Sequence, residues 1–341
     1  MIICSMTMYR LIIFVIIVVA SITQLDGQVE EWQDSYRSYT INVDLKSDEI
    51  LFDYELYFIS EDKKGSYRTA SLDTFVLLLK NDIANFPTGK ENILFYIHGM
   101  FGGQVLNYKS TLVDFRLRYI DPPASDMSRI VGYRWPGNSL DYPKCRDNAH
   151  AIAEAMNENF REILNHITAE SPSTSVNVIA HSLGSELWKE MMVYENTYAS
   201  DNINLNQVVI CAPDLDENAF HEGTPLSLAK ARCKGLTVYH SNKDFTLTMS
   251  KNFNNRNRLG LDGPDEATAF GSNLSFVETS KIADEENFAW KMTGHSYVRA
   301  SERCSGDILS VFIGLQASEI AHRLPQADKL GCYILEPAAD Q

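Results

Sequence analysis

The chain has few cations for its size. Its 341 residues include 30 Lys and Arg against 45 Asp and Glu, a formal net charge of −15. This balance argues against a nucleic-acid partner, because such proteins neutralise phosphates with surplus cations. None of its six cysteines stands at C-x-x-C spacing, and no glycine-rich turn is followed by Gly-Lys-Ser/Thr. We therefore expect no zinc site, no phosphate-binding loop, no metal and no cofactor.

The chain also lacks an apolar run long enough to span a membrane comfortably. Its longest run, residues 11–20, follows Arg10 and ends at Ser21, an arrangement typical of a secretory signal peptide. We predict a signal peptide over residues 1–20, with cleavage as late as residue 27. The mature protein is then secreted or periplasmic and has no stable membrane span. An uncleaved signal anchor that tethers the protein to a membrane is the alternative.

Cysteines are too few and too widely spaced for a disulfide framework. Without Cys4 an odd number remains, with Cys304 and Cys332 on either side of a helix expected at 307–324. An exported chain permits a disulfide between these two. Unpaired thiols, or a bond from Cys304 to Cys145 or Cys233, are the alternatives.

Neither repeats nor linkers divide the chain, and its apolar strand patterns alternate with helical ones. Two antiparallel edge strands are expected at 39–45 and 51–59, in an N-terminal extension over 28–65. A helix is expected to begin after Ser71. Further strands are expected at 93–97, 129–135, 176–180, 207–212, 236–240 and 274–279, and helices at 105–119, 147–167, 184–198, 226–231 and 307–324. This alternation predicts an α/β fold whose mostly parallel central sheet carries helices on both faces. We assign residues 66–325 to the catalytic domain and 326–341 to a C-terminal tail.

Residues 176–184 are the most informative segment. An apolar, β-branched run stops at the pentad A-H-S-L-G (180–184), and a helical pattern follows at once. Strand, tight turn and helix form the context of a nucleophile elbow, in which the serine is strained and its neighbours two residues away are small. We predict Ser182 as the nucleophile and the N–H of Leu183 as an oxyanion donor. A serine that only caps the helix is the alternative.

A serine hydroxyl needs a base, and the base needs an acid that fixes its tautomer. In the α/β-hydrolase order the acid follows the serine and the histidine comes last. Asp244 lies just beyond the strand at 236–240, so we predict it as the acid, with Asp214 after the preceding strand as its rival. His295, in a loop before the closing helix, is the predicted base, unless it merely caps that helix. His181 adjoins the serine, but we expect its side chain to point elsewhere from the turn.

The second oxyanion donor is expected in the loop after the first core strand. Residues 96–103 read Y-I-H-G-M-F-G-G, whose glycines let backbone approach a substrate. We predict the N–H of Met100 as this donor and His98 as a structural brace within the loop.

Seven short motifs occur in one order: Y-I-H-G (96–99), Y-R-W-P-G (133–137), A-H-S-L-G (180–184), A-P-D-L-D (212–216), S-N-K-D (241–244), R-L-G (258–260) and G-H-S-Y (294–297). The set resembles a little-characterised, esterase/lipase-like branch of the α/β-hydrolase superfamily over roughly residues 90–320. The resemblance implies the α/β-hydrolase fold, with Ser182, Asp244 and His295 as nucleophile, acid and base. It implies no particular substrate.

These observations predict a serine hydrolase that cleaves small-molecule or lipid-like carboxylic esters through an acyl-enzyme. An amidase, peptidase or thioesterase would use the same residues. A catalytically silent binding protein with the hydrolase fold is the alternative from another class. Five aromatic residues adjoin the motifs and are candidates to line a substrate pocket, or else belong to the core: Phe101, Trp135, Tyr142, Phe245 and Trp290.

Overall fold

A computed structural model describes residues 37–46, 49–58, 66–86, 89–171, 173–195, 205–266, 268, 271–282, 284 and 293–337. The signal peptide that we predict, its cleavage region and Trp290 lie outside these residues.

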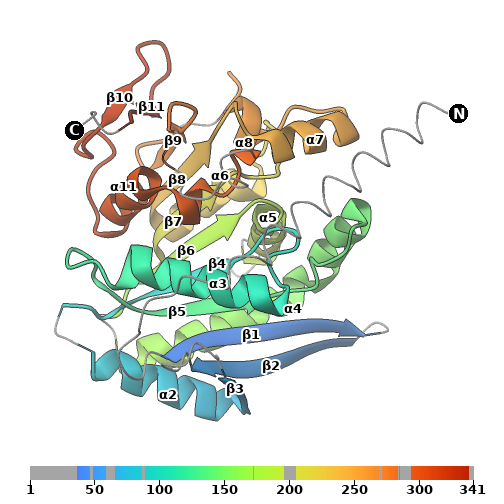
Figure 1. Ribbon diagram of the computed structural model, residues 1–341, viewed down its shortest axis with the longest axis vertical. Coiled ribbons are helices and arrows are strands. Elements are labelled where there is room, and N and C mark those ends of the chain that lie inside the picture. Colours follow the sequence, from blue (N-terminus) through green and yellow to red (C-terminus); the bar gives the residue numbers. More distant parts are fainter. Residues whose placement is uncertain are drawn as a thin grey trace, which may run out of the picture.

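The described residues form an eleven-stranded mixed sheet in the order β10-β11-β9-β8-β7-β6-β4-β5-β1-β2-β3 (Figure 1). Neighbouring strands from β11 through to β1 are parallel. The outer strands β2, β3 and β10 pair antiparallel. The expected mostly parallel sheet is therefore confirmed. Its strands are β1 (Arg37–Lys46), β2 (Glu49–Phe58), β3 (Ser66–Ala70), β4 (Asn92–Ile97), β5 (Met127–Arg134), β6 (Val176–His181), β7 (Leu205–Cys211), β8 (Cys233–His240), β9 (Leu274–Glu278), β10 (Arg323–Pro325) and β11 (Cys332–Leu335).

Helices cover both faces of the sheet, and each face has its own buried apolar cluster (Figure 1). One face carries α2 (Leu72–Ala84), α4 (Tyr142–Glu170), α5 (Gly184–Glu195) and α6 (Pro225–Ala229), which a 3-10 turn η2 (Lys230–Arg232) extends. The other carries α3 (Val105–Phe115), the π-helical turn η1 (Arg116–Ile120), α10 (Tyr297–Ala300) and α11 (Glu302–Phe312). Because strands covered on both sides need apolar residues throughout, the central strands read as the continuous runs seen in the sequence. No described helix has the length and hydropathy that crossing a membrane requires.

Side-chain caps explain where two of the helices begin. Ser71 Oγ accepts from the Thr74 N–H at 3.3 Å and begins α2 where the sequence indicated. Helix α4 begins five residues before the expected position 147, at Tyr142. Asp141 accepts from the Lys144 N–H at 3.2 Å, and a proline occupies the first turn, so these two residues fix the earlier start.

Both ends of the sheet differ from expectation. The strands β1 and β2 pair antiparallel as expected, but β1 also pairs in parallel with β5, so β3 forms the edge instead. The helix expected at 307–324 is wrong, because α11 runs from Glu302 to Phe312. Beyond it the chain turns at Gly314, which has φ 86°, and Ile313 and Leu315 are exposed. The apolar pattern of these two residues predicted that the helix continues, but the chain instead returns to the sheet as β10 and β11.

All five described cysteines are buried, unpaired thiols. Cys304 belongs to the apolar cluster beneath α11, whereas Cys332 belongs to the cluster on the opposite face of the sheet. The sheet thus lies between the two thiols, and the disulfide considered from the sequence does not form.

Candidate active site

Ser182 occupies a strained turn between β6 and α5. Its φ is 55°, a left-handed conformation that costs a non-glycine residue free energy unless its surroundings impose it. Its N–H donates to the Cys211 carbonyl at 3.0 Å, and its carbonyl accepts from the Asp214 N–H at 3.3 Å. A Cβ on Gly184 would lie 2.4 Å from the His98 carbonyl oxygen, so only glycine fits there. The local geometry is that of a nucleophile elbow.

The loop after β4 lies directly against this serine. A Cβ on Gly99 would stand 2.5 Å from Ser182 Cβ and 3.1 Å from Ser182 Oγ. Phe101 has φ 63°, and its N–H donates to the Gly137 carbonyl at 2.9 Å, which anchors the turn. Within the described part of the chain, the N–H groups of Met100 and Leu183 donate to no protein acceptor. Two N–H donors are thus left available, one next to Ser182 in sequence and one next to Gly99, which packs against Ser182.

His98 braces this loop, as its sequence position indicated. Its Nδ1–H donates to the Gly99 carbonyl at 2.6 Å, while its Nε2 accepts from the Trp135 N–H at 3.2 Å. The Trp135 indole N–H returns a bond to the His98 carbonyl at 2.8 Å, and the two rings stack 5.5 Å apart. Burial lowers the pKa of His98 to about 4, so the imidazole is neutral at ordinary pH.

Asp244 and His295 form a hydrogen-bonded pair. Asp244 is the N-cap of α7 (Phe245–Asn254), where its Oδ1 accepts from the Leu247 N–H at 2.9 Å. Its Oδ2 accepts from His295 Nδ1 at 2.6 Å. Burial opposes the charged form of His295, but the adjacent Asp244 carboxylate outweighs this and raises the pKa of His295 above its usual value. The loop that carries His295 approaches Lys243 closely at Gly294, which has φ 57° and where a Cβ would lie 2.8 Å from the Lys243 carbonyl oxygen.

Asp214, the rival acid, has a different partner. Its Oδ1 lies 3.0 Å from Arg258 Nε and accepts from Ser250 Oγ at 2.5 Å. Arg258 is almost fully buried, also pairs with Asp216, and donates to the Tyr142 hydroxyl at 3.2 Å. The motifs at 212–216 and 258–260 therefore meet in an ion-pair network around the buried Arg258, which also donates to Ser250 on α7. Arg258 is also the N-cap of α8 (Leu259–Asp262).

The segment after His295 is anchored by contacts of three residues, Tyr297, Val298 and Arg299. The Tyr297 hydroxyl donates to the Tyr239 carbonyl at 2.9 Å and accepts from the Ala212 N–H at 2.8 Å, which joins it to β7 and β8. Arg299 Nε lies 3.0 Å from an Asp114 carboxylate oxygen on α3. The Val298 carbonyl accepts from the Tyr119 hydroxyl at 2.5 Å.

Sequence reasoning missed His181. Its side chain does not point away from the site: its Nε2 lies 3.0 Å from the His295 carbonyl oxygen, and the two rings are 4.8 Å apart. The motif spacing held no signal for this contact, because it depends on where a loop 114 residues later returns to the sheet.

The candidate pocket aromatics separate into different environments. Trp135 is buried against His98, and the Tyr142 hydroxyl belongs to the Arg258 network. Phe101 is half-buried on the loop after β4. Phe245, directly after Asp244, is 44% exposed and remains a candidate to contact a substrate.

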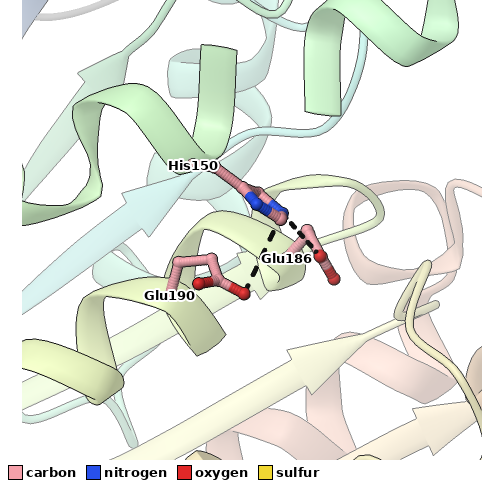
Figure 2. A group of neighbouring side chains, drawn as sticks. All are labelled: His150, Glu186 and Glu190. Carbon is pink, nitrogen blue, oxygen red and sulfur yellow. Dashed lines mark hydrogen bonds and ion pairs between the residues drawn. The ribbon is translucent and has the colours of Figure 1, made fainter. Parts of the chain in front are cut away.

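One group of side chains has a composition that could ligate a metal ion (Figure 2). His150 on α4 places its Nε2 2.9 Å from a Glu186 oxygen and 3.9 Å from a Glu190 oxygen on α5. Lys189 already bridges both carboxylates at 2.9 and 3.1 Å, and Arg146 lies 3.5 Å from Glu186. Burial alone would raise the pKa of Glu186, but the His150 hydrogen bond and the two cations lower it to about 2. Because permanent cations balance both carboxylates, we assign this cluster to the packing of α4 on α5.

The parallel sheet, the strained elbow and the acid–histidine pair at the carboxyl ends of its strands define an α/β hydrolase. The chain belongs to the family described as alpha/beta hydrolase of unknown function (DUF900), whose model matches residues 80–292. Among solved structures, the chain is similar to an acetylxylan esterase, at 13% identity and a TM-score of 0.31, over 65% of this chain and 95% of that one. No curated protein matches the sequence.

Proposed function

We propose that this α/β hydrolase is a serine hydrolase that cleaves carboxylic esters through an acyl-enzyme. One observation supports it above all: the 2.6 Å hydrogen bond from His295 Nδ1 to Asp244 Oδ2, at the sheet edge that carries the strained Ser182. A histidine held this way presents Nε2 as a base, and a serine on an elbow presents its hydroxyl to that base. Within the described residues no hydrogen bond joins Ser182 to His295. Such contacts are often loose in unliganded enzymes and tighten when substrate binds.

In the proposed reaction, Ser182 Oγ attacks the acyl carbon while His295 Nε2 takes the hydroxyl proton. The tetrahedral oxyanion accepts hydrogen bonds from the N–H groups of Leu183 and Met100, which have no acceptor among the described residues. The C–O bond then breaks, and the alcohol leaves with the proton from His295. Water attacks the acyl-enzyme with His295 again as base, which releases the acid and restores Ser182. Asp244 stays ionised throughout and stabilises the imidazolium.

A fluorophosphonate probe and a panel of p-nitrophenyl esters test this proposal. The wild-type protein should be labelled at Ser182 and should hydrolyse the esters, whereas Ser182→Ala should lose labelling and about 10³-fold or more of kcat. Amide and thioester analogues in the same panel identify the preferred bond. A folded Ser182→Ala protein with wild-type turnover would remove the basis for the assignment. Ser185→Ala is the matched control, because Ser185 is a buried serine on the same helix whose hydroxyl donates to the Ser182 carbonyl.

A further inference from the structure

We propose that His181 is a positioning residue that holds the base His295 against the nucleophile turn through its Nε2–H and the His295 main-chain carbonyl. This inference rests on the proposed function. It assigns a role in the reaction to a side chain that the catalytic steps themselves do not use.

The contact joins the two halves of the site by a short path. The His181 Nε2 to His295 oxygen distance is 3.0 Å, and the ring centroids are 4.8 Å apart with an interplanar angle of 49°. His181 is bonded directly to Ser182, and the acceptor is the carbonyl of the base itself. A single hydrogen bond therefore fixes the main chain of the base relative to that of the nucleophile.

Three other anchors of the loop that carries His295 act at residues beyond it. Those at Tyr297, Val298 and Arg299 all follow the base in sequence and tie the chain to β7, β8, η1 and α3. The bond from Asp244 orients the His295 ring but does not fix the main chain at His295. His181 thus supplies a restraint at the base that these contacts do not duplicate.

The charge state of His181 suits this position. Burial, together with charge repulsion from the neighbouring His295 and Arg299, lowers the pKa of His181 to about 3. A neutral imidazole whose Nε2–H faces the carbonyl must leave Nδ1 unprotonated. Asp244 and Asp214 are the charged groups that act on His295 and favour its protonated form. A neutral His181 therefore holds the loop without a second positive charge beside the imidazolium formed in catalysis.

Three substitutions of His181 separate the effect of its hydrogen-bond donor from the effect of its packing. His181→Gln keeps an N–H near the Nε2 position, His181→Asn has an amide one carbon too short to reach, and His181→Phe keeps a ring without a donor. Active-site titration with the fluorophosphonate counts functional sites, so kcat can be expressed per folded enzyme. We expect the Asn and Phe variants to lose about 10- to 100-fold in kcat at little-changed KM, because small misplacement of a catalytic group costs this much. The Gln variant should stay within about threefold of wild type.

A spectroscopic readout tests the same point without turnover. In the proton NMR spectrum of the wild-type protein, the proton shared by His295 Nδ1 and Asp244 should give a downfield signal. Asp244→Asn should remove this signal. This signal should persist in His181→Gln and weaken or broaden in His181→Asn. Equal kcat in the folded Gln and Asn variants, whether high or low, would overturn the positioning role. If instead wild type and Ser182→Ala hydrolyse ester equally, the proposed function fails, whatever the NMR signal shows.

Discussion

Asp244→Asn is the sharpest test of the proposed triad, because both oxygens of Asp244 have defined partners. Oδ1 accepts from the Leu247 N–H at 2.9 Å and Oδ2 accepts from His295 Nδ1 at 2.6 Å. Asparagine has one oxygen and one NH2 group. If its oxygen keeps the helix cap, its NH2 faces His295 Nδ1 and can pair only with the tautomer that has no proton there. The proton then resides on Nε2, where a base must be free to accept.

The opposite orientation of the asparagine side chain is also unfavourable. It would turn the NH2 group toward the Leu247 N–H, which leaves two donors facing each other at a buried cap. We therefore expect kcat to fall about 10³- to 10⁴-fold, a loss of about 4 to 5.5 kcal/mol of transition-state stabilisation. The measurement is initial-rate hydrolysis of a p-nitrophenyl ester by protein whose folding is verified by circular dichroism and thermal melting.

Asp214→Asn is the matched control at the end of the neighbouring strand. Its carboxylate contacts Arg258 and Ser250, so its loss should lower the free energy of unfolding by about 2–4 kcal/mol and leave kcat per folded molecule within about tenfold. A folded Asp244→Asn enzyme that keeps more than a tenth of wild-type kcat refutes the assignment of the acid. An exchange of effects between the two variants would move that role to Asp214.

Four further predictions follow from other parts of the chain. Gly99→Ala should lower kcat about 100-fold or more, because the new Cβ would lie 2.5 Å from Ser182 Cβ. Gly306→Ala is the control and should leave kcat unchanged, because its Cβ meets nothing within 4 Å. Equal kinetics in both variants would contradict this prediction. His295 acts as the proposed base in its neutral form, and Asp244 raises its pKa above 6.5. We therefore expect kcat/KM to fall as the pH drops through a value above 6.5. An acid limb centred below 6.5 in a pH–rate profile would contradict this. Alkylation of the unfolded, unreduced protein should modify all five described cysteines, and a peptide linking Cys304 to Cys332 in a mass spectrum would count against the separation by the sheet. The mature protein should begin between residues 21 and 29, and N-terminal sequencing that finds residues 1–20 retained in a membrane fraction would favour the anchor.

The sequence indicated the sheet well, because its central strands are buried on both faces and carry runs of β-branched residues. It indicated the outer elements poorly. Strands β10 (Arg323–Pro325) and β11 (Cys332–Leu335) are too short to show an alternating pattern. The exposed Ile313 and Leu315 continue the apolar spacing of α11, so the sequence indicated a longer helix than the structure has. Edge strands and surface apolar residues follow from pairing and exposure, which local periodicity does not encode.

The elbow and the proposed acid–base pair could be found in the sequence for a different reason. A tight turn restricts the size of its residues, so Gly184 marks the turn in the sequence as clearly as Ser182 does. The order of nucleophile, acid and base along the chain then reduced the candidates to Asp244 or Asp214 and to His295. The side-chain partners favour Asp244 as the proposed acid, since Asp214 pairs with Arg258 and Asp244 contacts His295.

What the sequence could not reveal is how the base is held in place. The base lies on a loop outside the sheet, so no strand register fixes its distance from Ser182. Its position depends on buried polar contacts from residues far apart in sequence, namely Asp244, His181 and the Tyr297 hydroxyl. Each contact is directional and fails beyond a few tenths of an ångström, unlike apolar packing, which tolerates small rearrangements. We therefore expect substitutions at these three polar positions to reduce kcat well before they unfold the protein, and substitutions in the apolar clusters to do the reverse.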